Sequence, residues 1–92
     1  MTLLIDDLRN IKADVIARTF DEGLNALAGP RFDVLYLDHD LGDENPRHTG
    51  YDILCWLEQH QDKLPGKIIL VTANPVGYKK MKDLITRLYG EH

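Results

Sequence analysis

Apolar and polar residues fall in blocks along this chain, and four short apolar blocks predict the strands of a sheet. They cover residues 1–5, 15–18, 32–37 and 67–72. Short apolar runs with β-branched residues are typical of buried strands. The block 32–37 is almost continuously apolar, so we expect a central strand that is buried on both faces.

Three other segments have helical periodicity and begin with residues that can cap a helix. The first starts at Thr19 and ends before Gly29-Pro30, the second covers residues 50 to about 60, and the third starts at Asn74-Pro75. Threonine and asparagine at these starts can accept hydrogen bonds from the first turn. Apolar residues recur on one side of each segment, so each helix has a face for a core.

The order is strand, strand, helix, strand, helix, strand, helix, which predicts an α/β domain with a parallel sheet. We expect residues 1–92 to form one such domain. Residues 7–14 leave room for a loop but not for a helix, whereas parallel neighbours usually need a longer crossover. An antiparallel or irregular start of the sheet therefore stays open.

Composition narrows the possible functions. The 92 residues carry 11 Lys and Arg against 15 Asp and Glu, a net charge of −4, which argues against general nucleic-acid binding. The single Cys55 excludes an internal disulfide and a multi-cysteine zinc site. No apolar run approaches the ~18 residues of a membrane span, and the start of the chain is too short and acidic for a signal peptide. We expect a cytoplasmic protein without a membrane partner.

Polar side chains follow three of the predicted strands directly. They are Asp6-Asp7, Asp38-His39-Asp40 and Thr72-Ala73-Asn74. In an open parallel sheet, ligands bind at the carboxyl ends of the strands, so parallel strands would bring these groups to one rim. Each group alone also has a structural explanation, as a solvated strand end, a loop or a helix start.

Crowded carboxylates repel one another unless some are protonated or a cation joins them. Oxygen ligands suit Mg²⁺, Ca²⁺ or Mn²⁺, and Mg²⁺ commonly pairs carboxylates with substrate phosphate. Thr72 and Asn74 would then donate hydrogen bonds to phosphate oxygens. His39 or His48 would move protons near neutral pH.

The segments LLIDDLR, FDVLYLD and IILVTAN resemble the receiver domain of two-component response regulators. The resemblance matches Asp6 and Asp7 to the receiver's acidic pair, Asp38 to its phosphoacceptor and Thr72 to its hydroxyl residue. It implies Mg²⁺ at the three aspartates. It also implies a small three-layer, flavodoxin-like sheet of about four strands, here without the first helix, the fifth strand and the lysine that receivers carry there.

A closer resemblance is to the receiver-like family of predicted cyclic-phosphate processing proteins, found in phage and bacteria. It rests on IDDLR (5–9), LDHDLG (37–42), TGYD (49–52) and TANPVG (72–77). Val71-Thr72 departs from the family, which often has His-Ser before Ala-Asn-Pro. The resemblance implies a phosphoesterase that acts on a cyclic phosphate.

The sequence is compatible with three alternative functions. In the first, a metal-dependent enzyme binds a small phosphorylated ligand or cyclic nucleotide. Its Mg²⁺ or Mn²⁺ ligands would be Asp6, Asp7 and Asp38, its catalytic residues Asp38, His39 and Asp40, and its phosphate-binding residues Arg9, Thr72 and Asn74.

In the second, a non-catalytic signalling module accepts a phosphoryl group on Asp38 or binds a nucleotide without turnover. In the third, a scaffold, such as a phage-encoded factor, binds a host protein. The truncated sheet leaves a free edge, so we expect a monomer or a weak dimer.

Overall fold

The computed structural model describes residues 1–90, which contain a four-stranded sheet in the order β2-β1-β3-β4. All neighbouring strands are parallel. The strands are β1 (Thr2–Ile5), β2 (Val15–Ala17), β3 (Val34–Leu37) and β4 (Lys67–Leu70). The helices are α1 (Phe20–Ala28), α2 (Gly50–Gln59) and α3 (Pro75–Tyr89), with a 3-10 helix η1 (Gln61–Lys63) after α2.

The predicted α/β fold is thus confirmed. The first two strands, β1 and β2, are parallel to each other rather than antiparallel. Residues 6–14 connect β1 to β2 without a helix, as expected. In the part of the chain that the structure describes, no helix has the length and apolar character needed to cross a bilayer.

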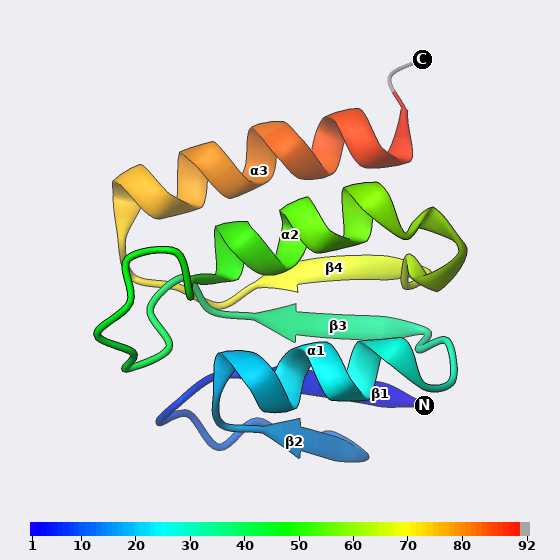
Figure 1. Cartoon of the computed structure of the whole chain (residues 1–92), viewed down its shortest axis with the longest axis horizontal. Helices are drawn as coiled ribbons and strands as arrows, with labels where there is room; N and C mark the ends of the chain where they lie inside the picture. Colours follow the sequence, from blue (N-terminus) through cyan, green and yellow to red (C-terminus); the bar gives the residue numbers. More distant parts are fainter. Residues whose placement is uncertain (91–92) are drawn as a thin grey trace.

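All three helices cover the same face of the sheet (Figure 1). The core contains Leu3 and Ile5 of β1 and Leu35 and Leu37 of β3, which share one face by their register. The helices add these buried residues to the same core: Leu27, Ile53, Leu54, Leu57, Met81 and Leu84. Helix α2 contacts both α1 and α3, so the helices form one layer.

The expectation of three layers is wrong for residues 1–90. Right-handed crossovers are the rule in parallel sheets. The connections from β2 to β3 and from β3 to β4 step in the same direction across the sheet, so they place α1 and α2 on the same face. Only the connection from β1 to β2 steps the other way, and it carries no helix.

The expected burial of β3 on both faces is therefore also wrong. Strand β3 is central, as predicted, but Leu35 and Leu37 are buried while Val34 and Tyr36 are partly exposed. The apolar strand β4 lies at an edge, and none of its residues is buried. A face without a helical layer and one free edge explain both results, although Leu4 of β1, on the same face as Tyr36, is fully buried.

The helix starts follow the sequence closely. Thr49 and Asp52 form a full capping box at α2. At α1 the Thr19 hydroxyl accepts a hydrogen bond from Glu22 N at 3.1 Å. The Glu22 carboxylate accepts from Arg18 N at 2.9 Å, whereas a full capping box would need Thr19 N as the donor.

The start of α2 also fits tightly under the end of β3. A Cβ atom on Gly50 would collide with the carbonyl oxygen of Asp38 and lie 2.8 Å from Met81 Cε. The backbone N–H of Gly50 donates to the carbonyl of His39 at 2.8 Å. Only glycine allows this close approach, which fixes the chain just after β3.

Replacement of Gly50 with alanine should lower the free energy of unfolding by about 1–3 kcal/mol, because the clash is with backbone. Helix propensity alone predicts the opposite, a gain of roughly 0.5–1 kcal/mol. Urea denaturation measures the sign. Gly29→Ala is the control, since its Cβ would meet Ala26 O at an ordinary 3.4 Å. A Gly50→Ala variant as stable as wild type would contradict the tight contact.

Candidate functional site

Three carboxylates from two neighbouring strand ends meet at the rim of the sheet. Single oxygens of Asp6, Asp7 and Asp38 all lie within 4.8 Å of one another. A sheet hydrogen bond joins the ends of β1 and β3, because Asp38 N donates to Ile5 O at 3.0 Å, and Asp6 N in turn donates to Ala17 O of β2 at 3.1 Å. The predicted convergence of these groups on one rim is present.

Asp6 is the buried member of this cluster, with 1% of its surface exposed. Its Oδ1 accepts hydrogen bonds from the backbone N–H groups of Leu8 and Arg9 at 3.0 and 3.1 Å. Its Oδ2 is buried and has no hydrogen-bond partner. Arg9 Nε lies 3.3 Å from Oδ2, an ion-pair distance without hydrogen-bond geometry. A buried carboxylate oxygen is therefore left without a donor.

Asp38 is partly buried beside Asp6. Burial raises the pKa of the Asp38 carboxyl above its ordinary 3.8, and the negative charge of Asp6 adds to the increase. The backbone N–H of His39 donates to Asp38 Oδ1 at 2.8 Å and opposes this change, as does the Thr72 hydroxyl. The environment of Asp38 thus disfavours its charged form and would be relieved by a nearby cation.

Asp7 is held against the loop that follows β3. Gly42 in that loop has a φ of +67°, a conformation that favours glycine. A Cβ atom on Gly42 would lie 2.9 Å from Asp7 Oδ2. The loop therefore returns to the acidic cluster and packs its backbone on the third carboxylate.

His39 is directed toward the first turn of α3. A Cβ atom on Gly77 would lie 2.6 Å from His39 Cγ, so the imidazole ring packs directly on that glycine. The side chain is 17% exposed, and its Nδ1 lies 3.0 Å from Asp40 Oδ1. Asp40 itself is largely exposed. Asp40 therefore lies where it can orient His39, and the catalytic role expected of both residues stays a prediction.

His48 makes contacts of its own. Its ring stacks on Phe20 with centroids 4.3 Å apart, and its Nδ1 lies 2.6 Å from Asp43 Oδ2. The backbone N–H of Asn45 and the ring of His48 hold the pKa of Asp43 below its ordinary value. These contacts attach the loop to α1.

Arg9, Thr72 and Asn74 stand at the same rim, with part of their polar groups already engaged. Half-exposed Arg9 lies beside Asp6. The Thr72 hydroxyl accepts from Asn74 N at 3.1 Å. The Asn74 side-chain oxygen caps α3 by accepting from Val76 N and Gly77 N. Their phosphate-binding role stays a prediction.

Sequence reasoning missed Arg18, Gly42 and Gly77. The Arg18 guanidinium donates to the carbonyls of Asp6 and Arg9 and to the Asn10 side chain at 2.7 Å, which fastens the loop after β1. Arg18 is the last residue of the predicted strand 15–18, and this position at a strand end was the available clue. The two glycines end the motifs LDHDLG and TANPVG, but the sequence alone did not show which side chains they contact.

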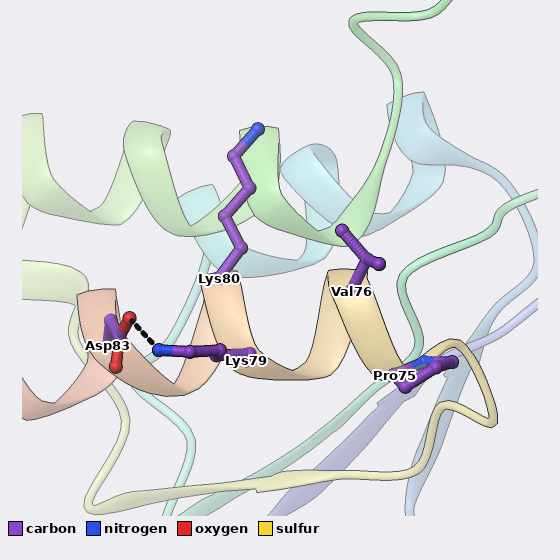
Figure 2. Close-up of a pocket in the computed structure, with 5 residues that line it drawn as sticks. All are labelled: Pro75, Val76, Lys79, Lys80 and Asp83. Carbon is purple, nitrogen blue, oxygen red and sulfur yellow. Dashed lines mark ion pairs between the residues drawn. The ribbon is translucent and has the colours of Figure 1, made fainter.

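A shallow hollow on the outer face of α3 is separate from this site (Figure 2). It is lined by Pro75, Val76, Lys79, Lys80 and Asp83. Lys79 pairs with Asp83 at 3.5 Å, and Lys80 Nζ lies 4.1 Å from the centre of the Tyr51 ring. Neither lysine forms an ion pair with the acidic cluster.

The residues fit a hard divalent cation such as Mg²⁺ or Mn²⁺. The donors are all carboxylate oxygens, which these ions prefer. Asp6 supplies a buried oxygen without a hydrogen-bond donor, and Asp38 lies in surroundings that disfavour its charge. Arg9 is the one arginine that forms an ion pair with the cluster in the described residues.

Comparison with known proteins identifies one family. The model of the cyclic-phosphate processing receiver domain matches residues 1–87. No curated protein and no solved structure matches the chain.

The raised pKa of Asp38 predicts a dependence of stability on pH. The folded protein holds this proton at pH values where the unfolded chain has lost it, so stability falls as pH rises above 3.8 through the folded pKa. Asp38→Asn should remove this loss. In metal-free buffer at neutral pH it should raise the free energy of unfolding by about 0.5–1 kcal/mol, a small value because Asp38 is partly exposed.

Denaturation at several pH values tests this, and the gain should shrink toward pH 3.8. Asp62→Asn, at an exposed position in η1, is the control and should change little at any pH. Equal stability of the two variants at neutral pH would show that repulsion within the cluster is negligible.

Proposed function

This chain belongs to the cyclic-phosphate processing receiver family, and we propose that it is a Mg²⁺-dependent phosphoesterase that opens a cyclic phosphate. The observation that carries the proposal is the cluster of Asp6, Asp7 and Asp38, with a buried Asp6 oxygen that lacks a donor. Mg²⁺ would be held by these three carboxylates. When bound, it would neutralise phosphate charge in a rim that otherwise repels anions.

The chain's own residues would then bind and orient the phosphate. Arg9 is half exposed and lies beside Asp6, so its guanidinium can pair with a phosphate oxygen. The Thr72 hydroxyl stands next to Asp38, and its single proton would turn from Asp38 to a phosphate oxygen when the ligand binds. Asn74 fixes the start of α3 through its side-chain oxygen, and its amide group would be the third donor.

His39 would move the proton. Hydrolysis of a cyclic phosphate breaks one of its two P–O ester bonds and forms a new P–O bond between the phosphorus and the oxygen of water. The water loses a proton, and the leaving oxygen gains one. With Nδ1–H of His39 donating to Asp40, Nε2 is the nitrogen that can accept the first proton or supply the second. Gly77 supports this orientation, because any side chain there would displace the ring.

Mg²⁺ should bind at the cluster. Addition of Mg²⁺ to the protein should shift the amide NMR resonances of residues 6–9, 38, 39 and 42. It should also raise the free energy of unfolding, because a ligand that binds only the folded state stabilises it. Asp38→Asn should weaken this binding by about tenfold or more, since it removes a charged ligand.

The matched control is Asp83→Asn, on the outer face of α3, which should bind Mg²⁺ as wild type does. Equal binding by Asp38→Asn and wild type would reject the cluster as the metal site. The absence of any shift at millimolar Mg²⁺ would reject metal binding altogether.

Turnover should depend on His39. With Mg²⁺, wild type should convert a 2′,3′- or 3′,5′-cyclic nucleotide into an acyclic phosphate monoester, followed by ³¹P NMR. His39→Gln should keep Mg²⁺ binding and lose about 10²–10⁴-fold in rate, the usual contribution of a general acid or base. His48→Gln, the other histidine of the same loop, should stay close to wild type.

An equal loss in both histidine variants would point to loop structure rather than proton transfer. If wild type binds Mg²⁺ but leaves every cyclic phosphate intact, the catalytic part of the proposal is wrong. The same sample, treated with a small phosphoryl donor, then tests the signalling alternative. A stable mass gain that Asp38→Asn abolishes would identify a phosphoacceptor.

A further inference from the structure

Strand β4 leaves the outer edge of the sheet unpaired within residues 1–90. Its residues Ile68, Ile69 and Leu70, and Val71 after them, are apolar, yet none of them is buried. Natural edge strands are usually short or protected by charge. Lys67, at the first position, is the single charge on β4.

The opposite edge is protected in the usual way. Strand β2 has three residues and lies between Asp14 and Arg18. Ile16 is its one exposed large apolar side chain, 43% exposed. The contrast singles out β4 as the edge that needs a partner.

The backbone of β4 has a definite set of free groups. Lys67 N and Val71 N donate to β3, at 2.9 Å to Asp33 O and 3.1 Å to Leu37 O. Residues alternate in a parallel ladder, so the N–H and C=O groups of the residues between them point alternately inward and outward. Those of Ile68 and Leu70 point away from β3, toward the open edge.

A groove runs along this edge between β4 and α3. Two neighbouring hollows form it, and both are lined by Ile68, Ile85 and Thr86. One extends to Lys67 and Tyr89, and the other to Leu70 and Tyr78. Apolar side chains from an added strand would find apolar contacts there, beside Lys82, which also lines the second hollow.

We infer that the free edge of β4 pairs with β4 of a second copy of this chain, in antiparallel orientation about Ile69. In that register Ile68 faces Leu70 of the copy, and the two residues exchange both backbone hydrogen bonds. Lys67 faces Val71 of the copy, so no like charges oppose each other. The arrangement closes on itself with two-fold symmetry, and it joins two sheets into one.

The choice of a second copy rests on this self-complementarity. Because Lys67 is the one charged residue of β4 and would lie opposite the apolar Val71, two identical β4 edges fit together without opposed charges between the strands. Ile69 would face Ile69 of the copy on the open face of the sheet, away from the helices. The acidic cluster is not part of this contact, so the inference is independent of the proposed phosphoesterase activity.

Sedimentation of the full chain from micromolar to millimolar concentration tests the association. Wild type should show a monomer–dimer equilibrium. Ile69→Lys opposes two like charges at the symmetry axis and should raise the dimer dissociation constant about tenfold or more. Ile16→Lys is the matched control, because Ile16 lies on the same sheet face at the other edge. It should leave the association unchanged.

A cross-link tests the register without relying on a disruptive change. Facing residues in a non-hydrogen-bonded antiparallel pair have Cα atoms about 4.5 Å apart, within reach of a disulfide. In a Cys55→Ala background, Ile69→Cys should form a covalent dimer under mild oxidation, and Ile16→Cys should stay a monomer.

A wild type that stays monomeric at millimolar concentration, with no Ile69→Cys dimer, would overturn the inference and leave the edge for a different partner. Dimers that are broken by Ile16→Lys and not by Ile69→Lys would also overturn it. Ile69→Lys should still bind Mg²⁺ as wild type does. A Mg²⁺ titration of this variant therefore distinguishes a loss of dimerisation from damage to the acidic cluster.

Discussion

The register between β1 and β3 is the constraint on which the site depends. The two strands are paired residue for residue, from Thr2 with Val34 to Ile5 with Leu37. The next residue on each strand is an aspartate, so the sheet itself brings Asp6 and Asp38 together. The apolar residues of both strands form the centre of the core, which holds the strands in register against carboxylate repulsion. A shift of one residue would expose that core.

The direction of the chain crossings decides the rest of the architecture. The crossings through α1 and α2 step the same way, and they place the helical layer on one face. The reverse crossing from β1 to β2 carries only a loop, and this loop bears Asp7 and Arg9. The absence of a helix there has two effects. It leaves the second face of the sheet without a helical layer, and it lets the loop stay close to the acidic cluster, where Arg18 fastens it.

Much of this was predictable from local sequence. Capping residues and apolar periodicity gave the three helices, because both depend on neighbours within one or two turns. The convergence of Asp6, Asp7 and Asp38 followed from strand order and parallel direction. The number of layers did not follow, because it depends on the hand and direction of each crossover. The burial of β3 and β4 was overestimated for the same reason: apolar composition predicts a strand but does not say what covers it.

The finer parts of the site were beyond local patterns. Gly42 and Gly77 support Asp7 and His39 through close contacts between segments that are distant in the sequence. The sequence around a glycine does not show which distant side chain will pack on it. The roles of the two loop histidines were also open from sequence. Their surroundings differ: His48 stacks on Phe20, whereas the ring of His39 packs on Gly77 in the first turn of α3.

Energetics favour a functional explanation of the acidic cluster over a structural one. A buried polar atom without a partner costs about 1–3 kcal/mol, more for a charged group. Asp6 Oδ2 is such an atom, and neighbouring Asp7 and Asp38 add repulsion rather than relief. If the cluster served stability alone, an asparagine, whose side-chain oxygen can still accept from Leu8 N and Arg9 N, would serve better at the end of β1. Arg9 offsets one charge of the cluster and leaves the others. A cation that joins all three carboxylates would account for the whole set, including the donor-free oxygen.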